Sequence, residues 1–209
     1  KRKTYAAMVS ALDDGVGLLL DKLTELDLDD NTLIFFLSDN GGPESKNASD
    51  NGILRGAKSS VYEGGFRVPF AIRWKGKITK GIFDKPVSSL DIMATAVALS
   101  GAKTNAEKPL DGVNLIPYLN GENNEKPHEN IYLRKFDQKK FAVRNNEYKL
   151  VINKGKKELY NLDKDISETN NIAKKFPEQV KKIDEIRKTW NEELIDPIFK
   201  GLIHLKKKK

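Results

Sequence analysis

Two long stretches of the chain repeat apolar residues at steps of three and four positions, which is the period of a helix with one buried face. The first predicts an amphipathic helix over most of 5–26, with Val9, Leu12, Val16, Leu19, Leu20, Leu23 and Leu26 on its apolar face. The second predicts an amphipathic helix after Pro177, with Val180, Ile183, Ile186, Trp190 and Leu194. A third helix is expected in SSLDIMATAVALSG, with Ser88 or Ser89 as its N-cap and Gly101 as its stop.

Shorter apolar runs bounded by polar residues predict β-strands. Two of them, 32–38 and 68–74, are apolar enough to be buried. Four more follow the polar stretch GENNEKPH, namely NIYLRK, KKFAVRN, YKLVINK and KELYNL, with Asn145-Asn146 and Lys154-Gly155 as the predicted hairpin turns. We expect these four strands to form a small antiparallel sheet with the helix after Pro177 on one of its faces.

The order of these elements predicts the α/β fold class. The step from the first helix into the strand at 32–38 fits a layered α/β sheet. Residues 41–65 are rich in Gly, Ser, Asn and Asp and show no sustained period, so they predict a long loop, and loops of that length are usually functional or disordered. We expect a core portion at 1–125 and a small α+β subdomain at 126–209.

Composition narrows the class of protein without choosing its function. The 209 residues are 38% hydrophobic and 32% charged, which suits a globular protein of one or two domains. The net charge of +7 favours anionic partners, whether nucleic acid, acidic polysaccharide or sulfate esters, and the four lysines at 206–209 are expected to form a solvated tail. Because there is no cysteine, a disulfide framework, a thiolate metal site and a cysteine nucleophile are excluded within these residues. No stretch is apolar enough to span a bilayer, and Asp13 and Asp14 stand where a signal peptide would need apolar residues.

The first candidate site follows the strand at 32–38, in the string LSDNGG. Asp39 and Asn40 are hard oxygen donors of the kind that calcium and magnesium accept. Gly41 and Gly42 are expected to permit a turn that points both side chains into one crevice. Two ligands cannot hold a calcium ion that needs about six to eight oxygens, so further ligands would have to come from elsewhere. An ordinary turn is the alternative reading.

The second candidate site is the string LRGAKSSVYEGGFRVP, in which small residues would let an anionic group approach the backbone. Lys58 stands in its glycine-bounded loop and is the candidate for an oxyanion contact, although an isolated lysine is more often a solvated surface charge. Glu63 and Arg67 are four positions apart, and we expect them to pair with each other and brace the loop.

Taken together, TLIFFLSDNGG and LRGAKSSVYEGGFRVP strongly resemble the carboxyl-terminal half of the type I, formylglycine-dependent sulfatases, which belong to the alkaline-phosphatase-like superfamily. The resemblance runs along nearly the whole chain. YAAMVSALDDGVGLLLDKL looks like the helix before the metal strand, and KPHENIYLR through ELYNLDKDISETNNIA looks like the small carboxyl-terminal sheet. The fold implied is the carboxyl-terminal part of an alkaline-phosphatase-like α/β sandwich plus a small antiparallel sheet packed with a terminal helix.

The resemblance implies a sulfuric ester hydrolase that uses calcium. Asp39 and Asn40 then correspond to calcium ligands, and Lys58 to a catalytic residue that contacts the substrate sulfate. A sulfated carbohydrate is the preferred substrate, a periplasmic or secreted location is implied, and neither nucleic acid nor a membrane is expected as a partner. The formylglycine nucleophile and its motif do not occur in this chain, so we expect it to be the carboxyl-terminal portion of a longer sulfatase, inactive without the remainder of the core.

Two other readings remain open at this point. A phosphatase or phosphodiesterase of the same superfamily would also hold a tetrahedral anion on a metal, and the missing nucleophile motif would discriminate it. A non-catalytic polyanion-binding module would use the +7 charge and would bind without calcium.

His128 and His204 do not stand in the contexts of the family's catalytic histidines, and His128 is expected to cap or pack near the subdomain junction. Asn47-Ala48-Ser49 matches a glycosylation acceptor, a short motif with a high chance rate.

Overall fold

The computed structural model of the protein describes residues 1–199. Contacts divide the chain into two compact units: unit 1 comprises Lys1–Ser38 and Pro69–Glu129, and unit 2 comprises Asp39–Val68 and the chain from Asn130 onward. The predicted domain boundary near residue 125 stays a prediction. His204 and the lysines at 206–209 lie outside the described residues.

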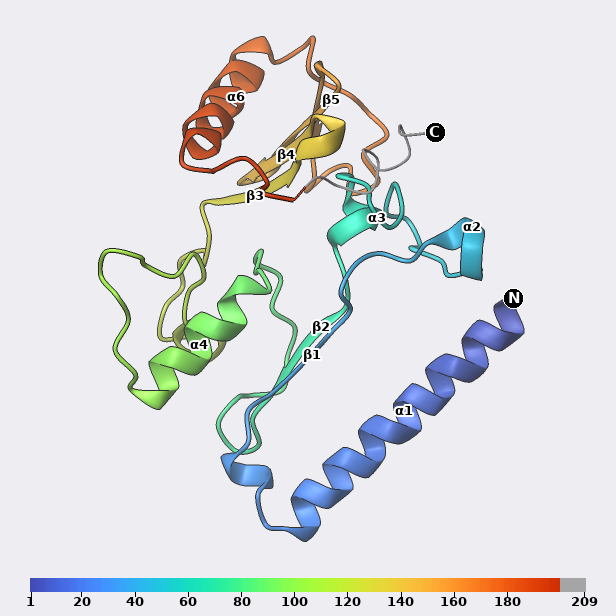
Figure 1. The fold of residues 1–209 in the computed structure, drawn as a ribbon, viewed down its shortest axis with the longest axis vertical. Helices are drawn as coiled ribbons and strands as arrows, with labels where there is room; N and C mark the ends of the chain where they lie inside the picture. The colour runs from blue at the N-terminus through green and yellow to red at the C-terminus, as the bar shows by residue number, and fades with distance from the viewer. Residues whose placement is uncertain (200–209) are drawn as a thin grey trace. The chain divides into compact units, whose positions relative to one another are not determined.

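Unit 1 contains the first predicted helix, the two apolar strands and the helix that ends at Gly101 (Figure 1). Its elements are α1 (Arg2–Glu25), η1 (Asp29–Asn31), β1 (Ile34–Leu37), β2 (Phe70–Arg73), α4 (Leu90–Ser100) and α5 (Ile116–Leu119). β1 and β2 pair antiparallel, with Leu37 opposite Phe70. Gly101 ends α4 in the left-handed region at φ 67°, as predicted, because a glycine has no Cβ to clash there. Ser89 is the N-cap residue of α4, but its side chain makes no capping hydrogen bond.

The apolar face of α1 is only partly covered by the described residues. The helix forms where the periodicity predicts it, yet none of its residues is buried. On that face Leu12 and Leu19 are 56% and 55% exposed, whereas Val16, Leu20 and Leu23 are half-buried. Packing of an amphipathic face supplies most of the stability of a helix in a protein, so this face is built for contacts beyond those that the described residues make. Among residues 1–199, no helix combines the length and the apolar character needed to cross a membrane.

His128 belongs to a buried structural network in unit 1. Its ring Nε2 lies 2.8 Å from Oδ1 of Asp91, a side chain with no exposed surface at the start of α4. The Asp91 carboxylate also accepts the backbone N–H groups of Ser88 and Val113, at 2.7 and 2.9 Å. This arrangement ties the segment after α5 to α4 and agrees with the packing role expected for His128.

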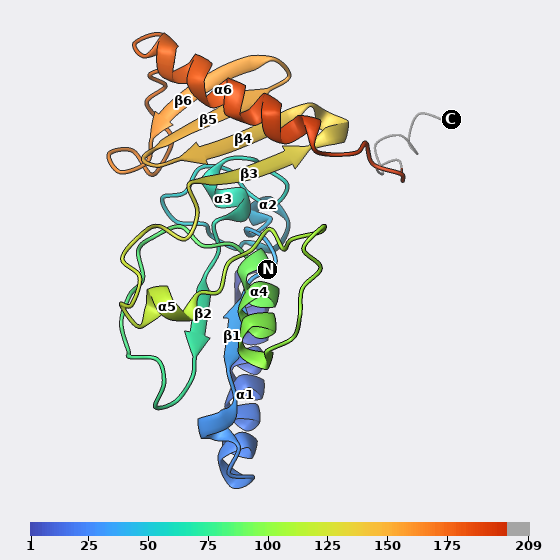
Figure 2. The same cartoon turned by 90° about the vertical axis from the view of Figure 1, so that its left-hand side faces the viewer.

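Unit 2 contains the predicted four-stranded sheet in the order β3-β4-β5-β6, all antiparallel (Figure 2). The strands are β3 (Asn130–Lys135), β4 (Lys140–Asn145), β5 (Tyr148–Asn153) and β6 (Lys156–Asn161), with η2 (Phe136–Gln138) before β4. Both predicted hairpins form: Lys154 and Gly155 adopt positive φ in the second turn as predicted, whereas the first turn is shifted by one residue to Asn146-Glu147, because Asn145 still pairs in β4. α6 (Pro177–Glu192) follows, as the second periodic stretch predicts.

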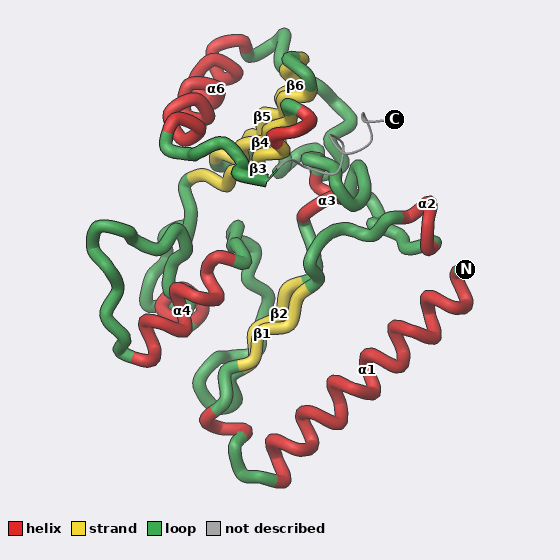
Figure 3. Tube along the Cα trace, in the orientation of Figure 1, coloured by secondary structure: helices red, strands yellow, loops and turns green. Residues whose placement is uncertain are grey.

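The sheet of unit 2 is covered on both faces. On one face, Val143, Leu150, Ile152 and Leu159 form a buried cluster with Ile183 of α6, which confirms the predicted packing of that helix. On the other face, Ala142, Val151, Tyr160 and Leu162 pack against Val61, which lies in the loop between β1 and β2. That loop is drawn mostly in green in Figure 3, and it also contains α2 (Glu44–Asn47) and α3 (Glu63–Phe66). The loop predicted for its lack of period is therefore ordered by the strands that it covers.

Candidate active site

Asp39 and Asn40 lie just beyond the carboxyl end of β1, where the sequence places them. Asp39 is exposed and Asn40 half-buried. Within residues 1–199, no group of three or more histidine, cysteine, aspartate or glutamate side chains lies close enough to hold a metal ion. The two side chains have the oxygen chemistry that calcium prefers but fall short of the roughly six to eight ligands that it takes, as the sequence already indicates.

The structure joins the two predicted sites through their backbones. The backbone N–H of Lys58 donates to the carbonyl oxygen of Gly42 at 3.3 Å, and that of Gly41 donates to Gly65 at 3.0 Å. The segments after Asp39 and around Lys58 are therefore neighbours within unit 2. The Lys58 side chain is exposed. Its ammonium group forms no ion pair with any of the described acidic residues, so its charge is not neutralised by a neighbouring carboxylate from this part of the chain.

Gly41 is required for space. The chain bends at Asp39 and Asn40, but neither Gly41 nor Gly42 has a positive φ, so the bend does not depend on a left-handed glycine conformation. A Cβ built on Gly41 would lie only 1.8 Å from the carbonyl oxygen of Gly64, which is a backbone atom and cannot swing away. Gly64 itself lies against the backbone of Gly56, 2.3 Å from where its own Cβ would be. The glycines of both motifs thus let three backbone segments pack at distances that any side chain would prevent.

The side chain and backbone of Glu63, the first residue of α3, hold this arrangement in place. The predicted pair with Arg67 is confirmed, with Arg67 Nη1 3.5 Å from Glu63 Oε2. A closer partner was missed: Lys149 on β5 places its Nζ 2.8 Å from Glu63 Oε1 and 2.8 Å from Glu168 Oε1. Glu168 Oε2 in turn accepts the backbone N–H of Glu63 at 2.6 Å.

Each of the three side chains of this Lys149–Glu63–Glu168 triad has at most 2% of its surface exposed. Burial raises the pKa of Glu168, and the charge of Lys149 acts in the opposite direction. The triad attaches α3, and with it the Asp39 and Lys58 segments, to the sheet of unit 2. The sequence gives one local indication of the triad. Side chains alternate along a strand, so Lys149 lies on the same face as the apolar Val151, where a lysine needs a partner.

A second cluster, around Glu158, holds the loop between β1 and β2 to β6. Glu158 Oε2 accepts hydrogen bonds from the hydroxyls of Tyr62 and Tyr160, at 2.6 and 2.7 Å, and Lys156 Nζ lies 2.9 Å from Glu158 Oε1. The Arg55 guanidinium lies 3.9 Å above the Tyr62 ring and donates to the Tyr160 hydroxyl at 2.8 Å. Burial alone would raise the pKa of Glu158, but the hydrogen bonds from Lys156, Tyr62 and Tyr160 outweigh it and lower the pKa to about 2.

This low pKa predicts an acid-sensitive contribution to stability. Because the folded-state pKa is about 2 and the ordinary value is 4.5, the contribution is present above pH 4.5 and is lost as the pH falls toward 2. We expect the Glu158→Gln variant to lower the free energy of unfolding by about 3 kcal/mol at pH 7. Urea unfolding of both proteins at several pH values measures the difference, which should shrink below pH 4.5. A difference that stays constant down to pH 2 would show that the charge of Glu158 contributes nothing.

Comparison with known families decides where the chain belongs. The family described as Sulfatase matches residues 1–102, and the family described as N-sulphoglucosamine sulphohydrolase, C-terminal, matches residues 57–197, which is more than half of the chain. The chain belongs to the sulfatase family. The resemblance predicted from its two central motifs is therefore confirmed.

Individual sulfatases extend the likeness. The uncharacterized sulfatase YdeN of Escherichia coli (strain K12) is 30% identical over 87% of this chain and 39% of its own length. The structure of Ps i-CgsB in complex with k-i-k-neocarrahexaose superposes with a TM-score of 0.89 and 37% identity, over 98% of this chain and 46% of that one. BT4656 in complex with its substrate D-glucosamine-2-N,6-O-disulfate superposes with a TM-score of 0.66 and 25% identity, over 90% of this chain and 40% of that one.

These superpositions confirm the predicted α/β class of this sulfatase chain and its alkaline-phosphatase-like fold. The chain spans less than half the length of each of these three relatives.

Proposed function

We propose that this chain forms the sulfate-binding and part of the calcium-binding portion of a sulfuric ester hydrolase. The observation that carries the proposal is the backbone link between the two motifs, in which Lys58 N–H bonds to Gly42 and Gly41 N–H bonds to Gly65. Membership of the sulfatase family supports it, as does the exposed ammonium of Lys58, which has no acidic partner among residues 1–199.

The chain's own residues would act by charge and position. Lys58 would contact a non-bridging oxygen of the sulfate ester and stabilise the negative charge that develops as the ester bond breaks. Asp39 and Asn40 would supply two of the oxygen ligands of a calcium ion, and a bound calcium supplies a fixed positive charge beside the sulfate. The nucleophile, which the resemblance implies is a formylglycine, would come from a part of the enzyme outside these residues.

The substrate class that we propose is a sulfated carbohydrate. Two of the similar structures hold sugars, one a neocarrahexaose and one a glucosamine disulfate described as its substrate. A periplasmic or secreted location would place such an enzyme where polymeric sulfated sugars occur.

The partner that we propose for unit 1 is the remainder of the sulfatase core. The exposed apolar side chains of α1 support this, since Leu12 and Leu19, seven positions apart on its predicted apolar face, are both more than half exposed. A helix face of this kind is expected against another layer of the same core. The same partner would bring the nucleophile and the calcium ligands that this chain lacks.

Calcium content of the full-length enzyme tests the proposal. We expect Asp39→Ala together with Asn40→Ala to weaken calcium binding at least 10-fold, because two of the inner oxygen ligands are removed. Sulfate ester turnover should fall with it. Asp84→Ala, an exposed acid of unit 1, is the matched control and should leave both unchanged. Equally tight calcium binding by the double variant and the wild type would contradict the proposed ligand role.

A further inference from the structure

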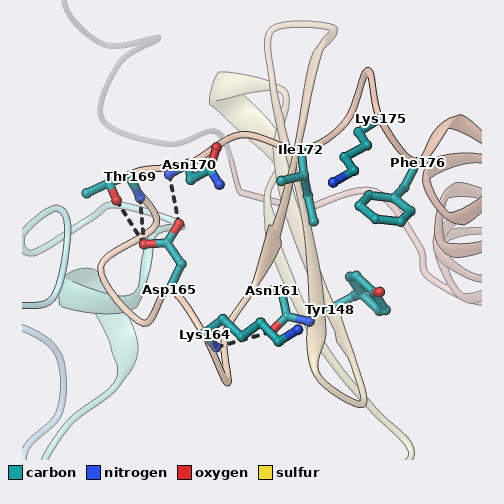
Figure 4. A pocket seen from close by; sticks show the side chains of 9 residues that line it. All are labelled: Tyr148, Asn161, Lys164, Asp165, Thr169, Asn170, Ile172, Lys175 and Phe176. Atoms are coloured by element: carbon teal, nitrogen blue, oxygen red, sulfur yellow. Dashed lines mark hydrogen bonds between the residues drawn. The ribbon is translucent and has the colours of Figure 1, made fainter.

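Unit 2 contains a pocket that none of the proposed catalytic residues line. Its volume is about 370 Å³. It lies where β5 begins and β6 ends, beside the segment that leads into α6 (Figure 4). The lining residues that matter here are Tyr148, Lys164, Asp165, Asn170, Lys175 and Phe176. Ligand pockets in proteins commonly have volumes of roughly 300–1,000 Å³, so this one is large enough for a small ligand.

The walls of the pocket are fixed by hydrogen bonds within the segment that forms them. The Asp165 carboxylate accepts the backbone N–H and the hydroxyl of Thr169, at 3.1 and 2.9 Å, and the backbone N–H of Asn170 at 2.8 Å. Ile172 N–H bonds to the carbonyl of Leu159 on β6 at 2.9 Å. A pocket with walls ordered before binding loses less conformational entropy when a ligand enters.

The charge of the pocket is positive. Lys164 and Lys175 line it from two sides (Figure 4), and neither ammonium group has an acidic partner among residues 1–199. Asp165 also lines the pocket and its carboxylate offsets one of the two lysine charges, but its oxygens are occupied by hydrogen bonds from Thr169 and Asn170, so the net charge of these three residues stays positive. These hydrogen bonds outweigh the opposing effect of burial and lower the pKa of Asp165, so it stays ionised and internally bonded.

Aromatic and amide groups complete the lining. The rings of Tyr148 and Phe176 lie with centroids 6.3 Å apart at an interplanar angle of 52°, and Phe176 is 37% exposed. The side-chain amide of Asn170 forms no hydrogen bond with other described residues, so it retains its full capacity to donate and to accept. A ring surface beside amides and ammonium groups offers apolar contact, hydrogen bonds and positive charge in one place, as a sugar ring with hydroxyl and anionic substituents requires.

We propose that this pocket binds a sulfated sugar unit of the polysaccharide, apart from the unit that reacts. Lys164 and Lys175 hold the sulfate group, the Asn170 amide bonds to hydroxyls, and the Phe176 ring packs against the sugar's C–H face. The proposal rests on the proposed function for its choice of a carbohydrate. Two lysines act as point charges rather than as a fork for planar groups, which suits a tetrahedral sulfate.

Calorimetric titration of this chain with a sulfated galactan hexasaccharide tests the proposal. At 150 mM salt we expect measurable binding by the wild type, and at least 10-fold weaker binding by the Lys164→Ala/Lys175→Ala variant. The control Lys181→Ala/Lys182→Ala removes the same charge from exposed positions of α6 that do not line the pocket, and its affinity should change less than twofold. The chemically desulfated hexasaccharide should bind at least 10-fold more weakly than the sulfated one.

Four results would overturn the proposal: no binding by the wild type, equal losses in the two double variants, equal binding of the desulfated sugar, or tighter binding of a single-stranded oligonucleotide through the same two lysines.

A different experiment distinguishes failure of the proposed function from failure of the pocket proposal. In the full-length enzyme, hydrolysis of a small aryl sulfate should be unchanged in the Lys164→Ala/Lys175→Ala variant, because that substrate is too short to reach a second site. An enzyme that hydrolyses no sulfate ester would refute the proposed function while leaving the binding result to stand or fall alone.

Discussion

The Lys58→Ala variant of the full-length enzyme should hydrolyse a sulfate ester about 10²–10³-fold more slowly than the wild type in kcat/KM. Removing one fixed donor of positive charge from a preorganised site typically costs several kcal/mol of barrier, because the charge that develops on the sulfate oxygens loses its partner. The backbone of Lys58 is held by the bond to Gly42, so truncating the side chain leaves the loop in place. Steady-state kinetics on an aryl sulfate measures the loss.

Two controls make this result specific. Lys46→Ala removes the same charge from an exposed position of α2 in the same loop and should stay within twofold of the wild type. Calcium content should be unchanged in the Lys58→Ala variant, since an ammonium group does not ligate a cation. Near-normal turnover of Lys58→Ala would remove this lysine from the chemistry.

The Lys149→Met variant should lose about 3–5 kcal/mol of unfolding free energy. The substitution removes the cation that the buried carboxyl groups of Glu63 and Glu168 share and leaves only the longer contact of Glu63 to Arg67, and breaking a buried ion pair from one side costs this much. Urea unfolding followed by tryptophan fluorescence measures the loss. In a Trp74→Phe background, Trp190 is the only tryptophan, and its ring stacks on Tyr132 of β3 at 4.6 Å, so it reports on unit 2.

A triple variant distinguishes charge from packing. Adding Glu63→Gln and Glu168→Gln to Lys149→Met removes both negative charges and should recover a large part of the lost stability, since neutral replacement of all members of a buried ion pair is often tolerated. Lys181→Met on the exposed side of α6 is the matched control, with an expected change of about 0.5 kcal/mol or less. If Lys149→Met unfolds with the same free energy as the control, the triad does not hold α3 to the sheet.

Most of the fold follows from the period of apolar residues. Both long helices and all six strands lie where the alternation or the three-four repeat predicts them, because each depends on neighbours within a few positions. The sequence predicts less well which segment covers each face of the sheet. The sequence assigns α6 to one face of the small sheet, but the other face is covered by Val61 from a loop with no period of its own.

The sequence predicts the residues of the candidate site but not the contacts that hold their segments in place. Asp39, Asn40 and Lys58 stand out because of their motifs. The triad does not, because Lys149 and Glu63 are 86 positions apart and a lysine in a strand is usually exposed. The steric requirement at Gly41 could not be predicted for a similar reason. Its need for space arises from Gly64, a contact that exists only after the loop has folded back.

The central claim is that Asp39, Asn40 and Lys58 converge on one sulfate-and-calcium site, and a crystal structure of the full-length enzyme with calcium and inorganic sulfate tests it most directly. The account predicts oxygens of Asp39 and Asn40 at about 2.3–2.6 Å from the calcium ion. It also predicts Lys58 Nζ at about 2.7–2.9 Å from an oxygen of the same sulfate that lies beside that ion. A Lys58 side chain that points into solvent, away from a sulfate bound elsewhere, would contradict it.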